Sequence, residues 1–260
     1  MATSTQNPEV HPTCLIGEIP FAATTLRSAT EFVINLGLQS ISIPVFLSNA
    51  YCVAHASKDP EYAALFSGRG IAFPDGLPIV WFMRGRMRGM IRPMRVRGPS
   101  LFVSTLDRGR EDELRHFFLG TTEDTLLQLT EEVRRRYPGA KISGFYSPPF
   151  GPLDHEFYRA AEDAIRKTDS QIVWVALGTP KQDFAAARLS SMVGQPCVAV
   201  GAAFDFVAGT SREAPLIVQR SGFEWLYRFM KEPRRLWRRY VFGNLTFLRV
   251  AALGGFQLRG

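Results

Sequence analysis

Short apolar segments alternate with longer helix-patterned segments along most of this 260-residue chain, and this alternation constrains the fold more than any other feature. The β-rich runs include "ISIPVFLSN" (41–49), "RHFFLG" (115–120), "QIVWVALG" (171–178) and "PCVAVGAAF" (196–204). Helical patterns lie beside or between them at 24–38, 121–139, 154–167 and 180–193. Strands joined by helices of this length are typical of a mostly parallel sheet with helices on both faces.

The predicted class is therefore α/β, with a Rossmann-like sheet and a C-terminal appendage. Residues 1–20 are polar at their start and suggest a flexible N-terminal arm, and residues 21–214 form the α/β core. From residue 215 the strand alternation ends, and aromatic residues recur at helical spacing among many arginines. This pattern predicts a basic helical appendage over residues 215–260.

The formal charge of +7 favours an anionic partner, which leaves nucleic acid, nucleotide phosphate and a membrane surface open. The three cysteines are isolated and odd in number, which argues against a disulfide scaffold and a cysteine-based metal site. The N-terminus lacks the pattern of a signal peptide, and no run of about 18 apolar residues occurs. We therefore expect a cytoplasmic protein whose membrane contact, if any, is peripheral.

Ligands of such sheets bind outside the carboxyl ends of the strands, so the polar residues at those ends are the candidates for function. In "VALGTPKQD" (175–183), Gly178 precedes the start of a helix, where backbone N–H groups suit an anion. Lys181 and Gln182 add a cation and an amide for a nucleotide. The alternative is an ordinary helix start, with Thr179 as N-cap and Pro180 in the first turn.

Two carboxylates stand at other predicted strand ends. Asp205, after Phe204 in "VGAAFDFVAG", can accept hydrogen bonds from a ribose or base, or can cap its own loop. Asp75, before Gly76 in "GIAFPDGLP", can act as a general base, or can cap the helix that follows it.

Several other chemistries are disfavoured by the sequence. The four histidines are scattered without ligand spacing, and no Gly-x-Ser-x-Gly motif occurs. No Asp-x-Asp pair follows a strand to hold a divalent cation under a diphosphate. We expect no metal site, so arginine side chains would have to stabilise any departing diphosphate.

Five motifs in order resemble the WecG/TagA/CpsF glycosyltransferase family, from about residue 40 to residue 240. They are "PDGLPIVW", "RVRGPSL", "VALGTPKQD", "VGAAFDFVAG" and "REAP…GFEWLYRFMKEPRRLWRRY". The resemblance implies an inverting, metal-independent transferase that needs no cofactor. It would move a sugar from a UDP-sugar donor to a lipid-diphosphate-linked saccharide in the synthesis of a bacterial exopolysaccharide or cell-surface polymer.

The resemblance also implies residue roles. Asp75 matches the proposed catalytic base, and Arg95 a basic residue near the donor diphosphate. The other positions expected to bind substrate are Asn49, Gly76, Gly98, Gly178, Lys181, Gln182, Phe204, Asp205, Arg228, Arg234 and Arg238. The appendage is expected to close over the site and to contact the anionic inner face of the cell membrane. Its aromatic residues could lie at the membrane interface or pack on the core, and both interpretations are open.

Departures from the family pattern, such as Leu47-Ser48-Asn49 and "SPPFGP" (147–152), leave the transferred sugar, the acceptor and the polymer open. The oligomeric state is also open, with a homo-oligomer possible. The main alternative is a non-catalytic nucleotide- or lipid-binding protein on the same fold. A nucleic-acid-binding role is disfavoured because no binding module is recognisable.

Overall fold

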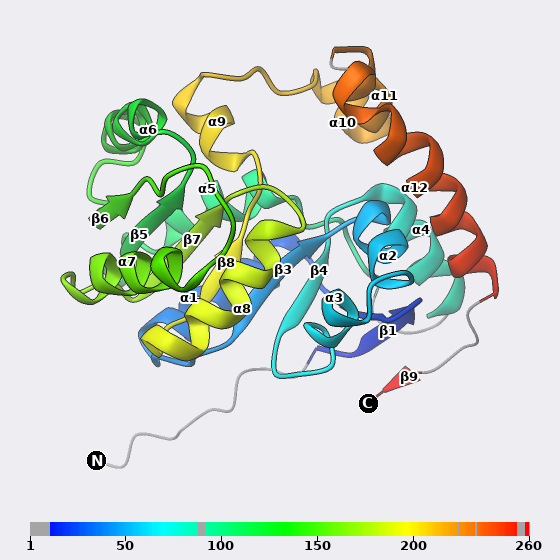
Figure 1. Ribbon diagram of the computed structural model, residues 1–260, viewed down its shortest axis with the longest axis horizontal. Coiled ribbons are helices and arrows are strands. Elements are labelled where there is room, and N and C mark those ends of the chain that lie inside the picture. The colour runs from blue at the N-terminus through cyan, green and yellow to red at the C-terminus, as the bar shows by residue number, and fades with distance from the viewer. Residues whose placement is uncertain (1–10, 88–91, 223, 232, 254–257, 260) are drawn as a thin grey trace.

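The computed structural model describes residues 11–87, 92–222, 224–231, 233–253 and 258–259. It contains one nine-stranded sheet in the order β6-β5-β7-β8-β3-β4-β2-β1-β9 (Figure 1). The strands are β1 (Thr13–Ile16), β2 (Ile19–Ala22), β3 (Pro44–Ser48), β4 (Ile71–Pro74), β5 (Arg115–Gly120), β6 (Lys141–Tyr146), β7 (Ile172–Ala176), β8 (Cys197–Ala199) and β9 (Leu258–Arg259). The strands from β6 to β2 pair in parallel, and β1 pairs antiparallel with β2 and β9. The predicted α/β class with a mostly parallel sheet is confirmed.

Both faces of the sheet are buried, as the apolar strands require. On one face, Leu47, Trp174 and Val198 pack with buried apolar side chains of four helices. The helices of this face are α1 (Leu26–Leu38), α5 (Gly98–Arg108), α6 (Glu123–Arg136) and α9 (Ala203–Ala208). The alternate strand residues, such as Phe46 and Val173, point to the other face.

The helices of that second face are α2 (Ala50–Ala56), α3 (Pro60–Ala64), α4 (Leu77–Arg86), α7 (His155–Arg166) and α8 (Lys181–Val193). Several helices begin where the sequence places a capping residue. Thr122 caps α6 through its side chain, with acids in the first turn and arginines in the last. Asn49 caps α2 in the same way and thereby stands at the carboxyl end of β3.

The predicted arm of residues 1–20 is too long at its C-terminal end. Residues 13–16 and 19–22 form the β1–β2 hairpin, in which Cys14, Ile16 and Phe21 are buried. Gly17, with φ of 60°, occupies the tight turn between the two strands. Residues 1–10 lie outside the described part of the chain.

The appendage consists of α10 (Leu216–Ser221), α11 (Glu224–Lys231) and α12 (Pro233–Leu253), which lie along the side of the molecule that carries α2 and α4 (Figure 1). The C-terminal half of α12 belongs to the core, because Phe247 and Ala251 pack with β1, α2 and α4 residues. Arg86 strengthens this contact by donating hydrogen bonds to the carbonyls of Leu15 and Ala251. No helix among the described residues is both long enough and apolar enough to span a membrane.

Candidate functional site

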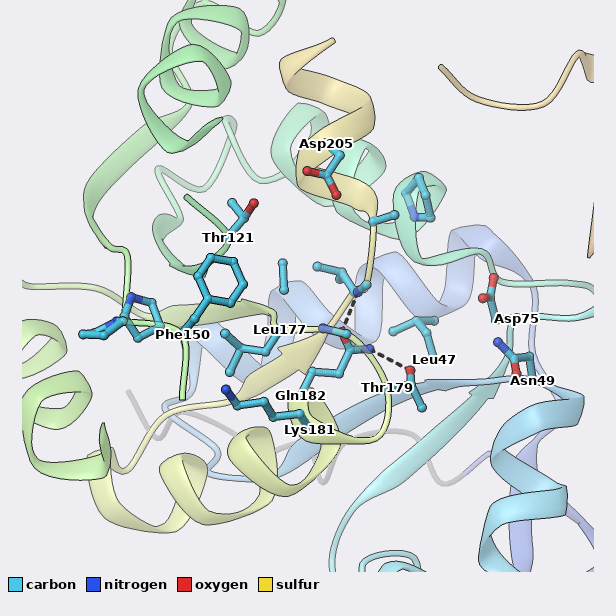
Figure 2. Close-up of a pocket in the computed structure, with 18 residues that line it drawn as sticks. Leu47, Asn49, Asp75, Thr121, Phe150, Leu177, Thr179, Lys181, Gln182 and Asp205 are labelled. Atoms are coloured by element: carbon cyan, nitrogen blue, oxygen red, sulfur yellow. Dashed lines mark hydrogen bonds between the residues drawn. The ribbon is translucent and has the colours of Figure 1, made fainter. Parts of the chain in front are cut away.

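A cleft of about 510 Å³ opens at the carboxyl ends of the parallel strands (Figure 2). Its walls come from the residues that follow β3, β4, β5, β6, β7 and β8, as expected for a parallel sheet, and from Pro99 near the start of α5. It brings together six of the residues singled out in the sequence: Asn49, Asp75, Gly178, Lys181, Gln182 and Asp205.

Asp75 and Asn49 lie at one end of the cleft (Figure 2). The N–H group of Asp75 donates to the carbonyl of Ser48 over 2.9 Å, which joins the ends of β3 and β4. Gly76, and not Asp75, occupies the N-cap position of α4. Oδ1 of Asn49 accepts from the N–H of Tyr51 at 3.0 Å, so the cap orients this side chain. A carboxylate and an amide are thus held beside each other by the backbone.

Gln182 connects two loops of the cleft wall. Its side chain is 2% exposed, and Oε1 accepts hydrogen bonds from the N–H groups of Gly178 at 3.2 Å and Gly201 at 3.1 Å. Its amide nitrogen donates to the Thr179 hydroxyl at 3.4 Å. Gln182 was predicted to contact the nucleotide. In the structure its carboxamide is hydrogen-bonded to the β7–α8 and β8–α9 loops, and it holds these two loops together.

Lys181 anchors the opposite end of the cleft. Nζ donates to the carbonyl of Gly151 over 2.5 Å and lies 5.8 Å from the ring centroid of Phe157. The loop it holds carries Phe150, a cleft residue whose side chain is 94% exposed. Figure 2 shows this ring beside Thr121 and Leu177, at the far end from Asp75.

Phe150 and Thr121 line the cleft but were not among the residues predicted to bind substrate. Thr121 directly follows β5 and has φ of 58°, a conformation that is rare for a β-branched residue. The "SPPFGP" loop follows β6 and contains two consecutive prolines before an aromatic residue. Both segments follow strands, at the edge of the sheet where ligands of such folds bind.

Asp205 lines the cleft from α9, whereas Phe204 does not. Phe204 is fully buried, with its ring centroid 5.4 Å from those of both Phe102 and Phe118. Successive residues of a helix point in different directions, so Asp205 faces the cleft while Phe204 packs on the core. The substrate contact predicted for Phe204 has no support in this arrangement, and among the described residues that line the cleft the aromatic one is Phe150.

Asp183, the neighbour of Gln182, lies in the core instead of the cleft. It is 2% exposed and accepts a hydrogen bond of 2.7 Å from the hydroxyl of Tyr62, which is fully buried on α3. Burial, together with the neighbouring Cys52 and Asp183, raises the pKa of Tyr62 far above its ordinary value. This phenol therefore remains a donor and fixes α8 to α3 beneath the cleft.

Three other predicted site residues support the cleft from outside. Gly98 begins α5, and a Cβ atom there would lie 2.6 Å from the carbonyl oxygen of Val200, so glycine permits the close approach of α5 to β8. Gly76 caps α4 next to Asn49. Arg95 contacts the backbone of Asp75 and two appendage helices. Its contact with the donor diphosphate stays a prediction.

The appendage arginines are not cleft residues in the described part of the chain. Arg234 is exposed near the start of α12. The side chains of Arg228 and Arg238 lie outside the described residues. No group of three or more His, Cys, Asp or Glu side chains suited to a metal ion was found within the described ranges.

Comparisons with known proteins identify the family that the five ordered motifs resemble. The model of the glycosyl transferase WecG/TagA/CpsF family matches residues 14–259. A Bacillus spizizenii strain W23 protein, N-acetylglucosaminyldiphosphoundecaprenol N-acetyl-beta-D-mannosaminyltransferase, is 32% identical over 187 residues, which cover 72% of this chain and 70% of the relative. A Bacillus subtilis strain 168 protein of the same name is 25% identical over 228 residues, covering 87% and 86%.

Proposed function

The chain belongs to the WecG/TagA/CpsF family of glycosyl transferases, and we propose that it transfers a sugar from a UDP-sugar to a saccharide carried on a lipid diphosphate. The names of both relatives describe a diphosphoundecaprenol-linked acceptor and the transfer of N-acetylmannosamine. An N-acetylhexosamine is therefore the first donor sugar to test. The product would be an intermediate of an exopolysaccharide or another cell-surface polymer.

One observation carries this proposal: a single cleft contains the Asp75 carboxylate and the two glycine loops that follow β7 and β8. Glycine loops at the carboxyl ends of parallel strands suit the phosphates of a nucleotide. The exposed ring of Phe150 at the far end suits a nucleobase, because base–aromatic stacking contributes about 1–3 kcal/mol per base. The donor would then lie with its base at Phe150 and its sugar at Asp75.

In the proposed reaction, the carboxylate of Asp75 takes the proton from the acceptor hydroxyl. The hydroxyl oxygen forms a bond to the anomeric carbon from the face opposite UDP. The bond from that carbon to the diphosphate oxygen breaks, and UDP leaves with the electron pair, so the configuration inverts. We propose that cationic side chains stabilise the leaving group in place of a metal; Lys181 is a cation among the described residues that line the cleft.

We also propose a peripheral position at the inner face of the cell membrane, where a lipid-linked acceptor would be found. Large apolar side chains are exposed on the appendage helices, namely Leu216, Ile217, Leu226, Met230, Leu245 and Leu248. Lys231 and Arg234 are exposed on the same helices. Exposed apolar side chains next to cations are typical of a surface that lies on anionic lipid.

The test is UDP release by the purified full-length protein from a panel of UDP-sugars, with a lipid-diphosphate-linked N-acetylglucosamine acceptor. We expect acceptor-dependent UDP release from one donor, unchanged by a metal chelator, and a product of inverted anomeric configuration. An absolute requirement for Mg²⁺ or Mn²⁺ would contradict the metal-free proposal. UDP binding without turnover of any donor would favour the non-catalytic alternative.

A further inference from the structure

A buried ion-pair network joins the segment between α4 and α5 to the appendage. Nη2 of Arg95 lies 2.5 Å from Oε2 of Glu224, the first residue of α11. Arg97 lies 3.2 Å from the other oxygen of Glu224 and 2.9 Å from Glu213. The side chains of Arg95, Arg97 and Glu224 are 10–15% exposed. We refer to these four residues as the Arg95–Glu224 network.

The same network reaches the backbone of the proposed base. Nε of Arg95 donates to the carbonyl of Asp75 over 2.6 Å, and Nη1 donates to the carbonyl of Gln219 on α10 over 2.8 Å. The N–H group of Asp75 is bound to Ser48 at 2.9 Å. The two peptide groups of Asp75 are therefore held from two sides, by β3 in the core and by Arg95.

The orientation of Arg95 depends on the appendage. Its planar guanidinium presents its donors in a fixed fork, so the contact with Asp75 and the contacts with Gln219 and Glu224 constrain one another. Arg97 adds electrostatic support. Burial alone would lower its pKa, but the carboxylates of Glu224, Glu213 and Asp75 outweigh burial and raise it.

We propose that Glu224 is a positioning residue for the transfer reaction, because it holds Arg95 in the orientation that fixes the Asp75 peptide. Docking of α10 and α11 on the core would then also fix the position of the base, because Arg95 contacts both. This inference rests on the proposed function for its kinetic consequences, but its structural consequence can be measured without turnover. It also gives Arg95 a role different from the donor contact that the family resemblance implies.

Steady-state kinetics of Glu224→Gln test the inference. A displacement of about 1 Å between reacting groups can lower a rate by about 100-fold. We expect kcat to fall by about 10- to 100-fold, while KM for the UDP-sugar stays within about threefold, because Glu224 is absent from the cleft lining. Glu224→Asp should restore much of kcat. A kcat within about twofold of wild type, or a rise in KM that accounts for the loss, would overturn the proposal.

Arg95→Lys provides a second variant with a cation of similar length. Lysine cannot span the Asp75, Gln219 and Glu224 contacts with one rigid group, so we expect the same fall in kcat. Glu213→Gln removes a partner of Arg97 but none of Arg95, and should have a much smaller effect. Glu162→Gln, which breaks a surface pair with Arg166, serves as the control for a lost carboxylate.

Hydrogen–deuterium exchange supplies the readout that is independent of activity. In Glu224→Gln, exchange should rise about 10-fold or more in peptides covering residues 71–80 as well as 215–231, with residues 115–135 unchanged. If exchange rises only in residues 215–231, Glu224 holds the appendage helices but does not order the Asp75 loop, and the proposal is refuted. If the wild type transfers no sugar, the proposed function fails, yet this measurement still decides whether Glu224 orders the Asp75 loop.

Discussion

At the scale of the residue, Asp75 is defined by its backbone contacts. Its N–H group and its carbonyl are bound to Ser48 and to Arg95, so the side chain starts from a fixed point at the end of β4. Asn49 lies beside it because its own side chain caps α2. A pre-positioned carboxylate of this kind suits proton abstraction from an acceptor hydroxyl.

Asp75→Asn keeps the shape of the side chain and removes the base. Because general-base catalysis contributes about 10²- to 10⁴-fold, we expect kcat to fall by at least about 100-fold, with little change in UDP affinity. UDP release and calorimetric UDP binding would measure the two quantities. Asp107→Asn, on the surface of α5, is the matched control. Full activity of Asp75→Asn would refute the assignment of the base.

Gln182→Ala tests the connection between the two glycine loops. The change removes the acceptor of the Gly178 and Gly201 N–H groups, so we expect a loss of about 1–3 kcal/mol in the free energy of unfolding and weaker UDP binding. Gln171→Ala is the control, because its side chain accepts from the Arg115 N–H at the start of β5. That variant should lose stability without losing UDP affinity; equal losses of affinity would refute a local role for Gln182.

At the scale of the element, the cleft depends on how closely α5 approaches the end of β8. Gly98 allows its backbone to lie against Val200, the residue that precedes the Gly201 loop. Pro99 of the same helix lines the cleft. The first turn of α5 is thereby part of the wall although Gly98 itself is covered.

Gly98→Ala would place a Cβ atom 2.6 Å from the carbonyl oxygen of Val200, and backbone cannot move aside easily. We expect the free energy of unfolding to fall by about 1–3 kcal/mol, together with UDP affinity. Gly85→Ala is the matched control: it lies inside α4, and its added Cβ would meet nothing within 4 Å. Alanine there should leave stability unchanged or raise it by about 0.5–1 kcal/mol. Equal responses in chemical denaturation would contradict the packing argument.

At the scale of the whole molecule, the appendage is attached to the core at both ends. The Arg95–Glu224 network holds its first helices, and Phe247 and Ala251 hold the end of α12. A truncation after Pro215 would therefore remove part of the core as well as the proposed membrane surface. Surface substitutions separate the two effects.

The double variant Ile217→Glu/Met230→Glu changes side chains that are 83% and 75% exposed. Burial of one such side chain contributes about 1.5–3 kcal/mol, so we expect binding to anionic vesicles to weaken by about 10-fold or more, with unchanged thermal stability. Leu127→Glu, on α6 at the opposite side of the molecule, is the control (Figure 1). Co-sedimentation with the vesicles at two salt concentrations measures the effect. Undiminished binding of the double variant would show that these two side chains are not part of the membrane-binding surface.

Much of the fold follows from local sequence patterns. The strand–helix alternation was predictable because it depends on residues close together in the chain, and it indicated the mostly parallel sheet. The alternative caps considered at Asp75 and Thr179 were each wrong by one residue, because Gly76 and Pro180 occupy the N-cap positions of α4 and α8. The β1–β2 hairpin was missed, although Gly17-Glu18 between two apolar runs is a recognisable turn signal.

The candidate site could also be predicted in part from the sequence. The order of strands and loops along the chain already indicates which loops meet, because the carboxyl ends of parallel strands lie at one edge of the sheet, and Asn49, Asp75, Gly178 and Asp205 do line one cleft. The directions of the long side chains, in contrast, depend on the packing of distant segments. Gln182 turns to two loop backbones, and Arg95 contacts Glu224, 129 residues later in the chain. Such directions depend on partners that no local pattern specifies, so they emerge only when distant segments pack.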